Sequence, residues 1–188
     1  SAEAGIPAPS MSAIRTRTSQ PPANPNLAER LDRNADLILD SSALDITVKS
    51  HDGWAVLATL TPLIHMESGH LLGAHVSAGE PVISTVAATL LNALEPEARS
   101  GSSQVPSPSL LVTGDLRDLQ PAIKQVSGIG RIVLDSQQSQ GLRAGAAITA
   151  ALGRRIGRIP IAPLRRRTAD AELVVPLEYA RAAVAHLL

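Results

Sequence analysis

The chain of 188 residues has a net charge of +0, no cysteine, and only one Trp and one Tyr as aromatic residues. Without cysteine it has no disulfide, no thiolate zinc site and no cysteine nucleophile. Without a basic excess or several stacking rings it lacks the usual features of a nucleic-acid-binding protein. No apolar run approaches the roughly 20 residues of a membrane span. We therefore expect a cytoplasmic protein with no nucleic-acid partner and no membrane insertion.

The composition, 44% hydrophobic and 18% charged, is typical of a globular domain. Residues 1–25 are rich in Ser, Pro and Ala and show no apolar period, which predicts a flexible tail or linker. Residues 26–188 then form a single α/β domain. The loop 95–109 is either a surface excursion or an internal boundary.

The first elements are read from periodicity. Asn26 and Glu29 form a capping-box pattern, and the apolar spacing that follows predicts a helix over residues 26–39. Residues 44–49 alternate as a strand and end at an Asp-Gly turn. Two strands follow, 55–64 and 71–77, joined by a polar turn. Pro62 cannot donate a ladder hydrogen bond, which indicates an edge strand or a bulge.

A helix is expected over residues 83–94, and beyond the loop the pattern alternates between short apolar strands and helices. This alternation predicts a parallel sheet covered on both faces, or part of an incomplete barrel. The strands are expected at 110–113, 131–134, 159–162 and 174–175, and the helices at 115–126, 139–152 and 177–188.

The central strand pair contains three consecutive segments, TPLI (61–64), MESGH (66–70) and LLGAHV (71–76). Together they resemble the opening motif of the EAL family, the cyclic-di-GMP phosphodiesterase domains of bacteria. Thr61-Pro62-Leu63-Ile64 stands where that family has a Gln-Pro-Ile-Val type sequence. Met66-Glu67-Ser68-Gly69-His70 is similar to its polar turn, and Leu71-Leu72-Gly73-Ala74-His75-Val76 to its Gly-x-Glu-Ala-Leu strand. The match covers residues 54–79, and it implies a bacterial signalling protein.

The departures from the family pattern imply a degenerate, inactive domain. The glutamate that is a metal ligand in the family is replaced by His75, and the family's later asparagine, paired aspartates and lysine are not recognisable. The stretch from Leu44 to Leu188 is also shorter than the roughly 200 residues of a complete barrel. Mg²⁺ is expected only if the domain is still a phosphodiesterase, and otherwise we expect no cofactor.

Three further features are candidates for a site. His65, Glu67, His70 and His75 are a candidate metal cluster, with His75 the assigned ligand, although the spacing fits half-buried and turn residues better. Asp135 follows a predicted strand, where open sheets place ligands but where carboxylates also cap helices. A basic cluster can hold an anion or form a solvated surface, and its members are Arg154, Arg155, Arg158, Arg165, Arg166 and Arg167.

The leading functional hypothesis is a non-catalytic, EAL-like regulatory or protein-interaction domain that takes a protein partner or self-associates. It would bind a nucleotide such as a cyclic dinucleotide, or another anion, through the arginine cluster and Asp135. Two alternatives stay open. One is a divergent, metal-dependent cyclic-di-GMP phosphodiesterase using His75, and the other is a structural self-assembly domain.

Overall fold

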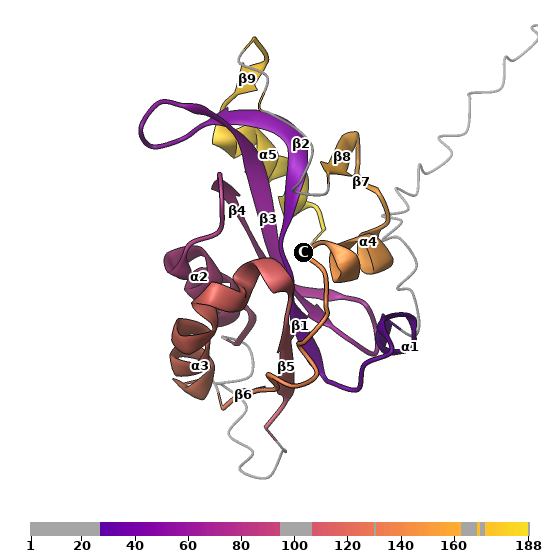
Figure 1. The fold of residues 1–188 in the computed structure, drawn as a ribbon. Helices are drawn as coiled ribbons and strands as arrows, with labels where there is room; N and C mark the ends of the chain where they lie inside the picture. The colour runs from indigo at the N-terminus through magenta and orange to yellow at the C-terminus, as the bar shows by residue number, and fades with distance from the viewer. Residues whose placement is uncertain (1–26, 95–106, 130, 163–168, 170–171, 188) are drawn as a thin grey trace, which may run out of the picture.

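A computed structural model describes residues 27–94, 107–129, 131–162, 169 and 172–187. The predicted tail, most of the loop 95–109, and Arg165, Arg166 and Arg167 lie outside these ranges. The described residues form a nine-stranded mixed sheet with helices on both faces (Figure 1). The α/β class is confirmed, and the described strands do not close into a barrel.

The central strand is β3 (Ala55–His65), which pairs with β4 (Leu71–Ala78) along one edge. Along the other edge β1 (Leu37–Leu39) and β2 (Ser42–Lys49) lie end to end, both antiparallel to β3. Both hairpins predicted from the sequence are therefore confirmed. Their turns use Gly53 and Gly69 at positive φ, a conformation that glycine adopts without strain.

The junction between β1 and β2 lies opposite Pro62. The Pro62 carbonyl accepts the Asp40 N–H at 3.2 Å, but proline has no N–H to return a ladder bond. The strand beside β3 is therefore interrupted there, between β1 and β2. The β3–β4 register shifts beside it, between Leu63 and Ile64. The predicted bulge is confirmed, whereas an edge position for β3 is wrong, because β3 has neighbours on both sides.

Beyond this junction the sheet divides into two parts. β5 (Ser109–Val112) and β6 (Val133–Leu134) extend β1 in parallel. β8 (Ile159–Ala162) adds to β2 in antiparallel and β9 (Val174–Val175) in parallel. β7 (Arg155–Ile156), which the sequence did not predict, forms a hairpin with β8. Among the strands expected to form a parallel sheet, β5, β6 and β9 are parallel to their partners, whereas β8 is antiparallel to β2 because the short β7–β8 turn and the β2 pairing form antiparallel ladders.

The helix predicted over residues 26–39 is the largest error. Helix α1 (Leu27–Leu31) ends after five residues, and Asp32 has a left-handed φ of +51°. Residues 37–39 are all buried, because the two faces of β1 pack into different cores. A strand with two buried faces is a continuous run of apolar residues in the sequence. Here the run also matches the helical spacing of the preceding apolar residues, so the sequence predicts a helix. Asn26, the predicted cap, lies outside the described residues.

Among the other helices only α2 (Ile83–Leu94) matches its predicted bounds. The helix expected over 115–126 is split into the 3₁₀ helix η2 (Gly114–Leu119) and α3 (Gln120–Ile129), because Pro121 cannot donate to the preceding turn. α4 (Ala146–Leu152) begins late, after Gly145 at φ +75°. The last helix, α5 (Leu177–Ala185), follows Pro176. No helix in the described ranges is long and apolar enough to cross a bilayer.

The sheet separates two cores. Leu37 and Leu39 face one core, with α2, η2 and α3, whereas Ile38 between them faces the other, with α1, α4 and α5. Successive strand residues point to opposite faces, so β1, β3 and β5 each contribute to both cores. The resulting arrangement has helices α2 and α3 on one side and α4 and α5 on the other (Figure 1).

Candidate functional site

The parallel strands β1, β5 and β6 end at one edge, which is where open sheets usually bind ligands. In this chain the segment that follows β6 occupies part of that edge. The Ser139 hydroxyl accepts the Val112 N–H at 3.0 Å and donates to the Asp135 carbonyl at 2.6 Å. This edge is therefore covered by the protein's own backbone.

Asp135 holds the covering segment in shape. One carboxylate oxygen accepts the N–H groups of Gln137 at 3.1 Å and Gln138 at 2.9 Å, and the other accepts the Gln138 side-chain amide at 2.9 Å. The hydrogen bond from the Gln138 N–H is the main cause that lowers the pKa of Asp135, and desolvation opposes it. The structure thus gives Asp135 the role of a loop cap, and its role as a ligand-binding residue stays a prediction.

Sequence reasoning missed the most deeply buried carboxylate among the described residues, Asp40. It accepts N–H groups from Ser41 at 2.7 Å, Gly145 at 2.8 Å and Ile148 at 3.0 Å. Desolvation raises the pKa of Asp40, and these hydrogen bonds oppose that rise. Since Gly145 has no side chain to cap α4, Asp40 supplies the cap from the β1–β2 junction. Asp40 therefore joins the sheet to α4.

The described part of the arginine cluster lies on the β7–β8 hairpin. Arg154, Arg155 and Arg158 are all exposed, and Gly157 makes the tight turn at φ +57°. No carboxylate or cavity gathers these three guanidinium groups into one site among the described residues. Anion binding by the cluster stays a prediction, and its other three members are outside the described ranges.

The four residues of the candidate metal cluster are not gathered together. His65 closes the β3–β4 turn, with its Nδ1 atom 3.0 Å from the Ser68 hydroxyl, and His70 is exposed. His75 on β4 pairs with Thr61 on β3, and not with His65. In the described part of the chain no three His, Asp or Glu side chains converge to hold a metal ion.

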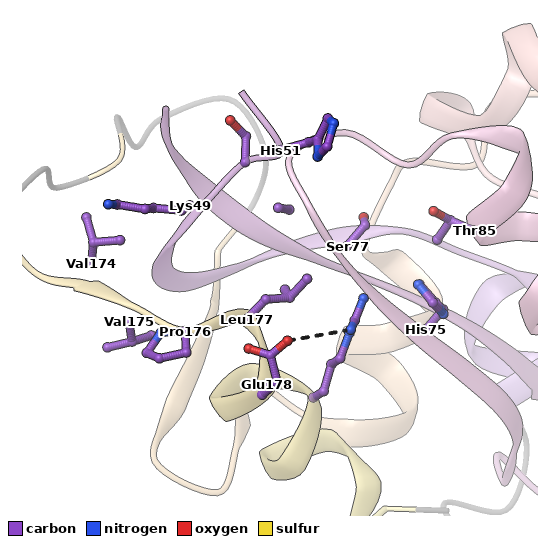
Figure 2. A pocket seen from close by; sticks show the side chains of 13 residues that line it. Lys49, His51, His75, Ser77, Thr85, Val174, Val175, Pro176, Leu177 and Glu178 are labelled. Carbon is purple, nitrogen blue, oxygen red and sulfur yellow. Dashed lines mark ion pairs between the residues drawn. The ribbon is translucent and has the colours of Figure 1, made fainter. Parts of the chain in front are cut away.

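His75 instead lines an open hollow of about 740 Å³. Figure 2 shows His75 and Thr85 at one end of the hollow, and Lys49 and Val174 at the other. Strands β2, β4 and β9, the start of α2 and the first turns of α5 all contribute. The described lining residues are Lys49, Ser50, His51, His75, Ser77, Ala78, Thr85, Val174, Val175, Pro176, Leu177, Glu178 and Arg181.

Arg181 on α5 is fixed against β4. Its Nε atom donates to the Val76 carbonyl at 3.3 Å, and its Nη1 atom lies 4.0 Å from the Glu178 carboxylate, the ion pair drawn in Figure 2. Arginine has five N–H donors in a planar fork. The bond from Nε therefore orients the guanidinium, and Arg181 also lines the hollow.

The charges that line the hollow favour an anion. Lys49, Arg181 and two histidines line it, whereas Glu178 is the single carboxylate among the described lining residues. Burial lowers the pKa of His75, and the positive charge of Arg181 lowers it further. A cation bound at His75 would meet the same repulsion from Arg181.

The residues of this hollow other than His75 were not assigned to a site from the sequence. Lys49, His51, Glu178 and Arg181 come from a strand end, a turn and a helix, and no motif spacing connects them. Only the fold brings them together. No protein-family model matches this chain, and a search of curated proteins also finds no match.

Proposed function

We propose that the chain is a non-catalytic regulatory domain that binds a small anionic ligand in the hollow between β2, β4 and α5. The observation that carries this proposal is the hollow's lining, where Lys49, Arg181 and two histidines outnumber one carboxylate among the described lining residues. A volume of about 740 Å³ is in the usual range of small-molecule sites and suits a ligand of nucleotide size.

The resemblance of residues 54–79 to the EAL family supports a nucleotide as the first ligand to test. His75, which occupies the position of the family's glutamate, lines this same hollow. The proposed setting is bacterial signalling in the cytoplasm, as the resemblance implies. Catalysis through two metal ions needs several converging carboxylates, and the described residues contain no such group.

A thermal-shift titration tests the proposal. The ligands are cyclic-di-GMP, GMP and inorganic pyrophosphate, each with and without Mg²⁺. A ligand at 100 times its dissociation constant stabilises the native state by about 2.7 kcal/mol, or roughly 5–10 °C for a domain of this size. We expect one of these anions to raise the midpoint of wild-type protein.

Arg181→Gln removes the oriented guanidinium and should abolish the shift. Arg117→Gln is the matched control, because Arg117 is exposed on η2 and does not line the hollow. An equal shift in wild type and Arg181→Gln, or no shift with any anion, contradicts the proposed site.

Self-association is a second candidate function, favoured by the outward face of α2. This helix has no charged residue over its 12 positions. Ile83 is 38% exposed and Leu91 49% exposed, and Ala87 lies between them at a spacing of four residues. Residues at i, i+4 and i+8 share one helix face. A large-small-large pattern of this kind is self-complementary when two copies of the helix cross in antiparallel at Ala87.

The test is the molar mass in solution as a function of concentration. We expect wild-type protein to form dimers that Leu91→Glu dissociates. Leu173→Glu, at a position that is 71% exposed and lies outside α2, is the control and should leave the dimer intact. A monomer across the accessible concentration range excludes this second function.

A further inference from the structure

His75 and Arg181 both line the hollow, and the charge of Arg181 acts on the imidazole. The Arg181 Nε atom bonds the carbonyl of Val76, the residue that follows His75 on β4. His75 is partly buried, so its ring has lost some of its contact with water. An empty hollow therefore favours a neutral imidazole, and both causes act in the same direction on its pKa.

An anion held by Arg181 reverses this balance, because it cancels the repulsion that Arg181 exerts on a protonated imidazole. We propose that the hollow takes up a phosphate ester together with one proton, which His75 receives as the ligand binds. This inference rests on the proposed function and adds the ligand class and its regulation. Ligand affinity then increases as the pH falls.

The choice of a phosphate ester follows from the donors. Arginine binds phosphate and carboxylate through two parallel N–H···O bonds, and a protonated His75 adds a further charged donor. A phosphate group presents more acceptor oxygens than a carboxylate and can engage both cations at once. The basic residues at the other end of the hollow, Lys49 and His51, can reach a second phosphate or another polar part of a nucleotide-sized ligand.

The other ionisable groups around the hollow come from several elements. Among the described lining residues, α5 contributes Arg181 and Glu178, β2 contributes Lys49, and the turn after β2 contributes His51. The neighbours on β3 and α2 are Thr61 and Thr85, which do not titrate. His51 is exposed and is the one other histidine that lines the hollow, so the experiment must separate it from His75.

Isothermal titration at pH 5.5 and pH 8.0 tests the proposal, with cyclic-di-GMP and sodium sulfate as separate probes. Both probes keep a constant charge over this interval, so any change in affinity comes from the protein. We expect wild-type protein to bind several-fold more tightly at pH 5.5, because a one-unit rise in the pKa of a single histidine sets an upper limit of about tenfold. His51→Gln should keep most of this ratio, whereas His75→Gln and His75→Asn should reduce it to less than about twofold.

A titration of the histidine ring resonances by NMR gives an independent readout. The His75 signal, assigned by its loss in His75→Gln, should titrate at a higher pH when the probe is present, and Arg181→Gln should remove the difference. If a probe binds with the same affinity at both pH values, or if the ratio survives in both His75 variants, proton uptake is overturned and the anion site stands. If neither probe binds at either pH, nor any anion of the thermal-shift panel, the proposed function falls as well.

Discussion

The buried carboxylate of Asp40 gives the sharpest test of how the fold is held together. Asp40→Ala leaves the N–H groups of Ser41, Gly145 and Ile148 without their acceptor, in a place where Asp40 and Ser41 are 0% exposed. Each buried donor left unpaired costs about 1–3 kcal/mol. Because the donors share one site and water can enter the space left by the side chain, we expect a total loss of about 4 kcal/mol.

Urea denaturation measures this loss directly. With an m-value of about 2 kcal/mol/M, the unfolding midpoint should fall by about 2 M. Domains of this size have a total stability of about 5–15 kcal/mol, so the variant would be marginally folded. Asp118→Ala, an exposed substitution on η2, should leave the midpoint unchanged. A loss below about 1 kcal/mol in Asp40→Ala, at an unchanged m-value, would refute the reasoning that Asp40 joins the sheet to α4.

Three further predictions follow from the same structure. Burial raises the pKa of Asp40 above its ordinary 3.8, so the folded protein binds this proton more tightly than the unfolded chain. The resulting contribution to the free energy of unfolding is fully present below pH 3.8 and is lost as pH rises through the folded pKa. The stability of Asp40→Asn should not show this decline. If denaturant titrations give the same difference in unfolding free energy between Asp40→Asn and wild type at every pH, the prediction is contradicted. The pKa of His75 is lowered below its ordinary 6.5, so protons bind the unfolded state first and wild-type stability falls as pH decreases through 6.5. His75→Gln should remove this part of the fall, and parallel stability curves for the two proteins would exclude it. Gly145→Ala places a Cβ 3.0 Å from the Ser42 hydroxyl at φ +75°, and should lower the thermal midpoint more than Gly153→Ala, which has a similar φ of +81° and open space. Equal losses in the two glycine variants would show that the contact with Ser42 costs nothing.

The sequence by itself determined the α/β class, the two hairpins and the bounds of α2. These features depend on neighbours within a few residues. Alternating side chains point to opposite faces of a strand, and an Asp-Gly pair adopts the turn that joins two strands. The central strands β3 and β4 and most of the later strands could be predicted for this reason, to within one or two residues.

The tertiary structure decided the elements whose environment is distant in the sequence. Residues 37–39 have helical spacing with the preceding apolar residues, but they are a strand because β3 and β5 supply hydrogen-bonding partners on both edges. Asp40 could not be recognised as a helix cap, since the helix that it caps begins more than 100 residues later. The basic hollow has the same origin. Lys49, His75 and Arg181 have no common motif, and they share a site only because α5 packs against the β4 edge.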